Sequence, residues 1–69
     1  MNELAKEYLA RHAGRYLDAA VALARDLMRG DPASFKDGYS ADNAAMASAE
    51  AFGYPTGWRH IRAQLGEES

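Results

Sequence analysis

Alanine dominates this chain: fifteen of its 69 residues are Ala, whereas only three residues are β-branched, namely Val21, Thr56 and Ile61. Alanine has the highest intrinsic helix propensity, and strands are built mainly from β-branched and aromatic side chains. We therefore predict an all-α fold. A chain of 69 residues has room for one hydrophobic core, so we predict a single domain over residues 1–69.

The first part of the chain carries an amphipathic pattern with a helical period. Between residues 2 and 29, apolar side chains fall on one arc of a helical wheel, and most charged side chains fall on the opposite arc. Gly30 follows, and glycine is the residue that most often ends a helix. The pattern predicts one helix over residues 2–29.

A straight helix of this length would be longer than its own domain. It would span about 42 Å at 1.5 Å per residue, whereas a compact chain of this size is about 28 Å across. One solution is that a second copy covers the overhang, and we expect a homodimer with Leu4, Tyr8 and Leu9 in its interface. The alternative is a helix that bends at Gly14, although glycine in a helix costs only about 1 kcal/mol relative to alanine and need not break it.

Shorter helical segments are expected after Gly30. Asp31 before Pro32 is typical of a helix start, Ser40 can cap a second segment, and Gly53 with Pro55 can end it. In the last segment, three apolar residues lie on one helical face: Trp58, Ile61 and Leu65. In chain order, we predict a short turn over 32–37, a helix over 41–52 and a helix over 57–65. The two last helices form a hairpin similar to a helix-turn-helix.

Part of this hairpin resembles a segment that flanks ankyrin repeats in bacterial proteins. There, an Ala-rich helix runs into Gly-Phe-Pro-Ser-Trp and then a Leu. The matching residues of this chain are Ala49, Phe52, Gly53, Tyr54, Pro55, Thr56, Trp58 and Ile61. Gly57, which is inserted before the tryptophan, departs from the pattern. The resemblance covers residues 46–65 and implies a packing motif in which the tryptophan closes the hairpin onto the core; it implies no activity.

The sequence contains no recognisable catalytic or metal-binding motif. There is no cysteine, and the two histidines, His12 and His60, are far apart in the chain. The residues three and four positions from His12 include no Ser, Cys or carboxylate, so we expect His12 to pack against the core. The aspartates at 31, 37 and 42 do not have the spacing of a calcium loop. We predict neither enzymatic activity nor a metal or other cofactor.

Aromatic and arginine side chains near loops are the candidates for contact with a partner. Tyrosine and arginine are enriched where proteins bind one another, because they bury a large area at low entropic cost. Tyr39 and Tyr54 lie in predicted loops, and Arg59 and Arg62 lie on the last helix. We predict that these four residues contribute to partner binding.

In size, lack of cysteine, Ala and Arg content and lack of catalytic motifs, the chain resembles the small proteins by which phages and mobile elements take over a host cell. Such proteins include anti-CRISPR proteins and inhibitors of quorum-sensing regulators. The resemblance implies a cytoplasmic inhibitor that binds and blocks a host protein, for example a transcription regulator. We expect no contact with membranes, because no run of residues is apolar and long enough to cross one.

Two other kinds of function remain open. The hairpin around Ala49 and Gly53 is compatible with a helix-turn-helix regulator that presents Arg59, His60 and Arg62 to DNA. A net charge of −2 does not favour it, since proteins that bind phosphates are usually basic. A structural or assembly subunit, which would form higher oligomers through the first helix, is the third possibility.

Overall fold

The described part of the chain, residues 1–30 and 38–66 of a computed structural model, folds into four α-helices and one 3₁₀ turn, and it contains no strand. The elements are α1 (Glu3–Arg11), α2 (Tyr16–Arg29), α3 (Ala41–Ala51), η1 (Pro55–Gly57) and α4 (Trp58–Gly66). The prediction of an all-α fold is therefore confirmed. The turn that we predicted over 32–37 lies outside the described residues.

The structure corrects the prediction of one helix over residues 2–29, because α1 and α2 are separate helices. α1 ends in a Schellman motif, in which the N–H of Gly14 donates to the carbonyl of Leu9 at 2.9 Å and the N–H of Ala13 donates to that of Ala10 at 3.3 Å. Both Ala13 (φ 55°) and Gly14 (φ 78°) have left-handed backbone conformations. Two successive residues of this kind reverse the chain, so the bend that we kept as the alternative is the one the chain adopts.

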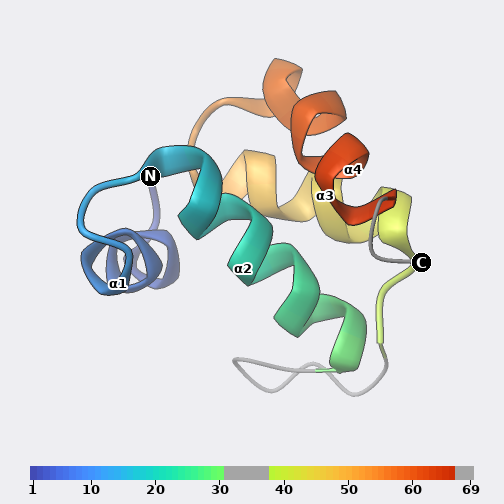
Figure 1. Cartoon of the computed structure of the whole chain (residues 1–69), viewed down its shortest axis with the longest axis horizontal. Helices are drawn as coiled ribbons and strands as arrows, with labels where there is room; N and C mark the ends of the chain where they lie inside the picture. The colour runs from blue at the N-terminus through green and yellow to red at the C-terminus, as the bar shows by residue number, and fades with distance from the viewer. Residues whose placement is uncertain (31–37, 67–69) are drawn as a thin grey trace.

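The reversal folds α1 back against α2. Figure 1 shows α1 nearly end-on at one side of the molecule, whereas α2 runs across the picture, so the two helices cross steeply. The face of α1 that carries Ala5 and Tyr8 meets α2, and the two side chains are 0% and 3% exposed. The Tyr8 hydroxyl donates a hydrogen bond to the carboxylate of Asp26. Arg29 also donates to this carboxylate, at 2.6 Å.

Small side chains allow α2 and α3 to approach closely. Four alanines at this contact are fully buried: Ala20, Ala24, Ala45 and Ala49. Ser48 lies among them, also fully buried, and its hydroxyl donates to the backbone carbonyl of Ala20 at 2.6 Å. This hydrogen bond satisfies the buried hydroxyl and ties the two helices at one defined position.

A second Schellman motif ends α3 and turns the chain into α4. The N–H of Tyr54 donates to the carbonyl of Ala49 and that of Gly53 donates to the carbonyl of Glu50, each at 2.9 Å, and Gly53 has a φ of 78°. Phe52, 5% exposed, enters the core at this turn. η1 follows and runs directly into α4, which packs against α3 and α2 through Ile61 and Leu65.

Candidate binding surface

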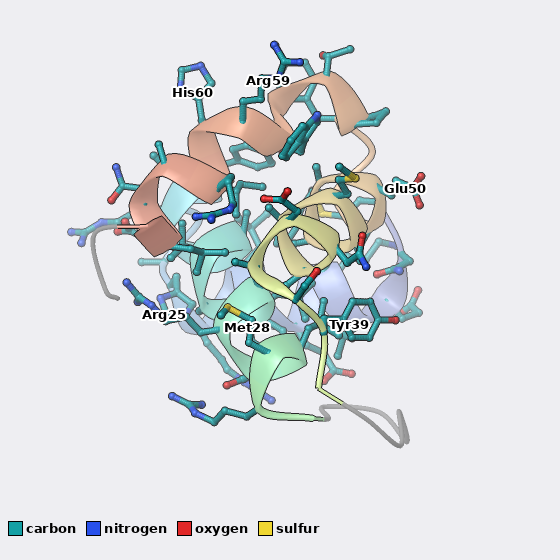
Figure 2. The ribbon with its side chains drawn as sticks, turned by 90° about the vertical axis from the view of Figure 1, so that its right-hand side faces the viewer. Arg25, Met28, Tyr39, Glu50, Arg59 and His60 are labelled. Carbon is teal, nitrogen blue, oxygen red and sulfur yellow. The ribbon has the colours of Figure 1, made fainter. Side chains whose placement is uncertain are left out.

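The structure does not bring the four predicted partner-binding residues together. Arg59 and His60 project from the outer side of α4, whereas Tyr39 lies beside the C-terminal part of α2, at the opposite end of the molecule (Figure 2). Tyr39 is only partly exposed, packs against the core, and donates its backbone N–H to the carbonyl of Leu27 at 2.9 Å. Its position fits a side chain that fastens the segment before α3 to α2.

Tyr54 is the most exposed of the large hydrophobic side chains in the described part of the chain, at 57%. Its ring nevertheless has a defined place, because it lies over the backbone of Gly57. A Cβ atom at Gly57 would come within 2.7 Å and 2.9 Å of two carbons of this ring. The edge of Tyr54 also meets Tyr16, with ring centroids 6.2 Å apart, and Tyr16 in turn packs edge-to-face on Phe52 at 5.3 Å.

Tyr16 supports Tyr54 from within the molecule. Its hydroxyl is buried and has no hydrogen-bond partner among residues 1–30 and 38–66. Burial is the main cause that raises the pKa of Tyr16 above its usual value, and the neighbouring Tyr54 adds to the effect. Tyr16 thus supports Tyr54 through its ring.

Arg59 lies five residues after Tyr54 in the chain, and its guanidinium lies over an aromatic ring. The central carbon of its guanidinium is 5.5 Å from the centre of the Trp58 ring, which is a cation–π distance. Trp58 is partly buried and packs against the core, so it is a fixed support. We call Tyr54, Trp58 and Arg59 the turn patch; Tyr54 directly precedes η1, and Trp58 and Arg59 are the first two residues of α4.

Arg62 does not belong to the turn patch. Its Nε donates to Asp42 of α3 at 2.6 Å, so its guanidinium is held against the N-terminal turn of that helix. We predicted partner binding for Arg62, and the structure instead places it in a link between α3 and α4.

The three residues predicted for a dimer interface are also placed differently. Tyr8 is buried against α2, and Leu4 and Leu9 are partly buried and pack against the core. Burial, followed by the hydrogen bond to Asp26, raises the pKa of Tyr8 to about 12. The overhang that these side chains were expected to share with a second copy does not exist, because the helix is broken.

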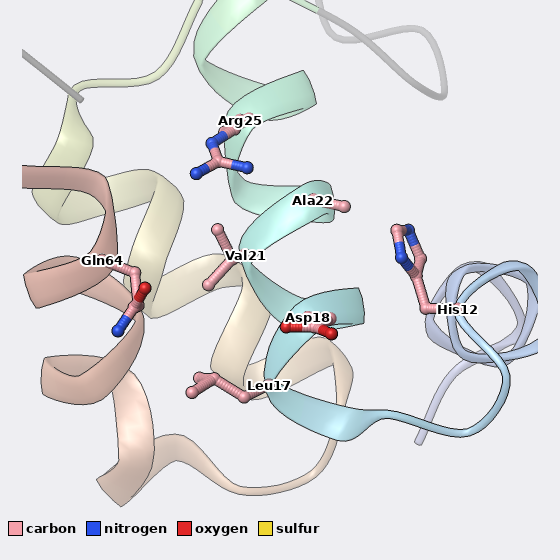
Figure 3. Close-up of a pocket in the computed structure, with 7 residues that line it drawn as sticks. All are labelled: His12, Leu17, Asp18, Val21, Ala22, Arg25 and Gln64. Carbon is pink, nitrogen blue, oxygen red and sulfur yellow. The ribbon is translucent and has the colours of Figure 1, made fainter. Parts of the chain in front are cut away.

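A shallow groove of about 250 Å³ runs over the outer side of α2. Its lining is His12, Leu17, Asp18, Val21, Ala22, Arg25 and Gln64. Figure 3 shows His12 on one flank of α2, after the end of α1, and Gln64 of α4 on the other flank. The groove is smaller than a typical ligand pocket of about 300–1,000 Å³, and no Ser, Thr, Cys or Lys lines it.

Sequence reasoning missed this groove. Leu17, Val21 and Arg25 are spaced four residues apart and share one side of α2, which is a visible signal. His12 reaches the groove only because the chain reverses after α1, and Gln64 only because α4 packs beside α2. Neither neighbour follows from the spacing.

Other kinds of site find no support in the described residues. No cluster of three or more His, Cys, Asp or Glu side chains there has the arrangement to hold a metal ion. None of the helices is both long and apolar enough to cross a membrane within residues 1–30 and 38–66.

No family model, curated protein or solved structure matches the chain.

Proposed function

We propose that this chain is a non-enzymatic protein-binding domain that acts by covering a functional surface of its partner. Tyr54 carries the proposal: its ring is 57% exposed, yet Gly57 and Tyr16 hold it in place. A large aromatic ring that is already ordered loses little conformational entropy when a partner covers it. In its finer form, the proposal is an inhibitor that blocks a host protein such as a transcription regulator.

The composition of the turn patch supports the proposal. Tyrosine, tryptophan and arginine are the residue types that contribute most often to protein–protein binding energy. The groove on α2 offers a competing surface, but its exposed apolar residue, Leu17, is 38% exposed and aliphatic. We therefore assign the turn patch as the main contact.

The test compares the two surfaces directly. We would immobilise the full chain, expose it to a lysate of its source cells after nuclease treatment, and identify retained proteins by mass spectrometry. The wild type is expected to retain one protein at near-equal stoichiometry. Tyr54→Ala should weaken its binding by roughly tenfold or more, and Leu17→Ala should leave it within about twofold.

Each contrary outcome has a definite meaning. A partner lost with Leu17→Ala and kept with Tyr54→Ala would move the binding surface to the groove. Thermal melts of both variants by circular dichroism show whether each remains folded. A treated lysate from which no protein is retained, beside an untreated lysate whose retained proteins are all lost on nuclease treatment, would contradict the proposal.

DNA binding is the second candidate. The α3–α4 hairpin favours it, since Arg59 and His60 are exposed on the outer side of its second helix. The net charge of −2 and the engagement of Arg62 by Asp42 weigh against it. The steep loss of binding with added salt that phosphate contacts cause would distinguish it.

A further inference from the structure

Most cationic side chains of the described residues have a carboxylate partner within the chain. Ion pairs include Lys6–Glu3 at 3.4 Å, Arg11–Glu7 and Arg15–Asp18 at 3.9 Å, and Arg29–Asp26 and Arg62–Asp42 at 2.6 Å. Arg59 differs from these five, because it forms no ion pair with any residue in 1–30 or 38–66. Its charge is therefore not matched by a carboxylate in this part of the molecule.

Arg59 lies over the Trp58 ring and forms no hydrogen bond or ion pair through its guanidinium within residues 1–30 and 38–66, so its hydrogen-bond donors are available. A guanidinium stacks through its flat face, whereas its five N–H groups point outward in its own plane. That fork matches the two oxygens of a carboxylate, and a support of fixed position reduces the entropy that Arg59 loses when it pairs. Arg59 is thus prepared for a bidentate contact.

The chain segment that contains Arg59 carries charge of one sign. Residues 51–66 contain two arginines and no Asp or Glu, although the whole chain has a net charge of −2. Figure 2 shows Glu50 projecting from α3, away from Arg59 and His60. A positive site within an acidic chain favours an anionic partner at this point and not elsewhere.

We propose that Arg59 binds a carboxylate of the partner protein, an Asp or Glu side chain that lies next to an apolar side chain in contact with Tyr54. This inference rests on the proposed function, because it names the chemistry of the surface that covers the turn patch. A carboxylate fits better than a nucleic-acid phosphate, since DNA affinity needs several cations and Arg62 is already paired with Asp42.

The experiment uses a displayed library of random 12-residue peptides as the probe. Separate selections are made against the full chain and against Arg59→Gln. The wild type is expected to enrich peptides that combine Asp or Glu with an aromatic or aliphatic residue, and Arg59→Gln is expected to lose the acidic preference. Arg11→Gln is the matched control, because Arg11 also stacks on an aromatic ring, 4.9 Å from the centre of Tyr8, but pairs with Glu7.

The best peptide then enters a double-mutant cycle, measured by fluorescence anisotropy. Arg59→Gln, or replacement of the peptide's acidic residue by its amide, should each weaken binding roughly tenfold, and the two changes together should cost little more than one. Arg11→Gln should leave the affinity within about twofold. A 12-base-pair DNA duplex is titrated in parallel and is expected not to bind.

The outcomes separate this inference from the proposed function. Peptides that need Tyr54 but show no acidic preference would overturn the carboxylate inference alone, as would additive losses in the cycle. DNA binding that Arg59→Gln abolishes would replace the carboxylate by phosphate. If the wild type selects no peptide, or only peptides indifferent to Tyr54→Ala, the proposed function itself is wrong and this inference fails with it.

Discussion

Two tyrosine hydroxyls show how much a single partner atom matters in this small core. The Tyr8 hydroxyl donates to Asp26, whereas the Tyr16 hydroxyl is buried without a partner among the described residues. A hydrogen bond to a charged group stabilises the folded state, and an unsatisfied buried hydroxyl costs free energy. Removal of the hydroxyl oxygen should therefore change the free energy of unfolding in opposite directions at Tyr8 and at Tyr16.

We expect Tyr8→Phe to lower the free energy of unfolding at pH 7 by about 1–3 kcal/mol, measured by urea denaturation. Tyr16→Phe is the matched control and should leave stability unchanged or raise it by up to about 1 kcal/mol. A loss of equal size in both variants would show that the Asp26 contact contributes nothing specific.

The contribution of Tyr8 to the free energy of unfolding should also decrease at alkaline pH. The folded-state pKa of about 12 lies above the ordinary value of 10.0, so the folded chain holds this proton more tightly than the unfolded chain does. The stabilisation is thus fully present below pH 10 and is lost as pH rises towards 12. The difference in stability between wild type and Tyr8→Phe should shrink across that interval, and a constant difference would contradict the assignment.

Gly57 shows at the scale of one atom why a glycine is needed in this turn. The ring of Tyr54 occupies the space that a Cβ atom at position 57 would need. The sequence shows the glycine, but only the folded turn shows which ring requires it.

At the scale of elements, the end of α1 is the decisive feature. Ala13 is a non-glycine residue with a φ of 55°, in a Schellman position where glycine is favoured. Gly14, with a φ of 78°, has open space where a side chain would go, since no atom lies within 4 Å of its Cβ position. Backbone strain can therefore be tested there without steric clash.

We expect Ala13→Gly to raise the free energy of unfolding by up to about 1 kcal/mol, because it relieves the left-handed strain of alanine. Gly14→Ala should lower it by about 1–2 kcal/mol for the converse reason. Chemical denaturation of both variants checks the pair. If Gly14→Ala is neutral or stabilising, α1 and α2 form one continuous helix, as we first predicted from the sequence.

At the scale of the whole molecule, the break after α1 changes the shape and the expected assembly. The described chain measures 25 × 25 × 19 Å, with a radius of gyration of 10.6 Å. A continuous first helix would have extended about 42 Å. The geometric reason for a homodimer depended on that length, and it disappears when α1 folds back and buries Tyr8.

We therefore expect the protein to sediment as a single chain of 7.5 kDa at micromolar concentration. Sedimentation equilibrium over a hundredfold range of concentration measures this directly. Leu4→Glu, at a partly buried position of α1, should not change the mass. A stable dimer that Leu4→Glu dissociates would restore the interface that we predicted from the sequence.

The sequence by itself determined the helical class of this protein and the ends of its helices at Gly30 and Gly53. Alanine content, the caps at Asn2 and Ser40, and the glycines at 30 and 53 act through local backbone preferences, which operate within a few residues. The tertiary structure alone decided that Tyr8 is buried, that Arg62 pairs with Asp42 and that Tyr54 is held over Gly57. The physical reason lies at the α1–α2 junction. Glycine at 14 can adopt a left-handed turn at a free-energy cost similar to that of remaining helical, so local backbone preference does not decide between a continuous helix and a reversed chain. The burial of Ala5 and Tyr8 against α2, together with the Tyr8–Asp26 hydrogen bond, stabilises the reversed chain.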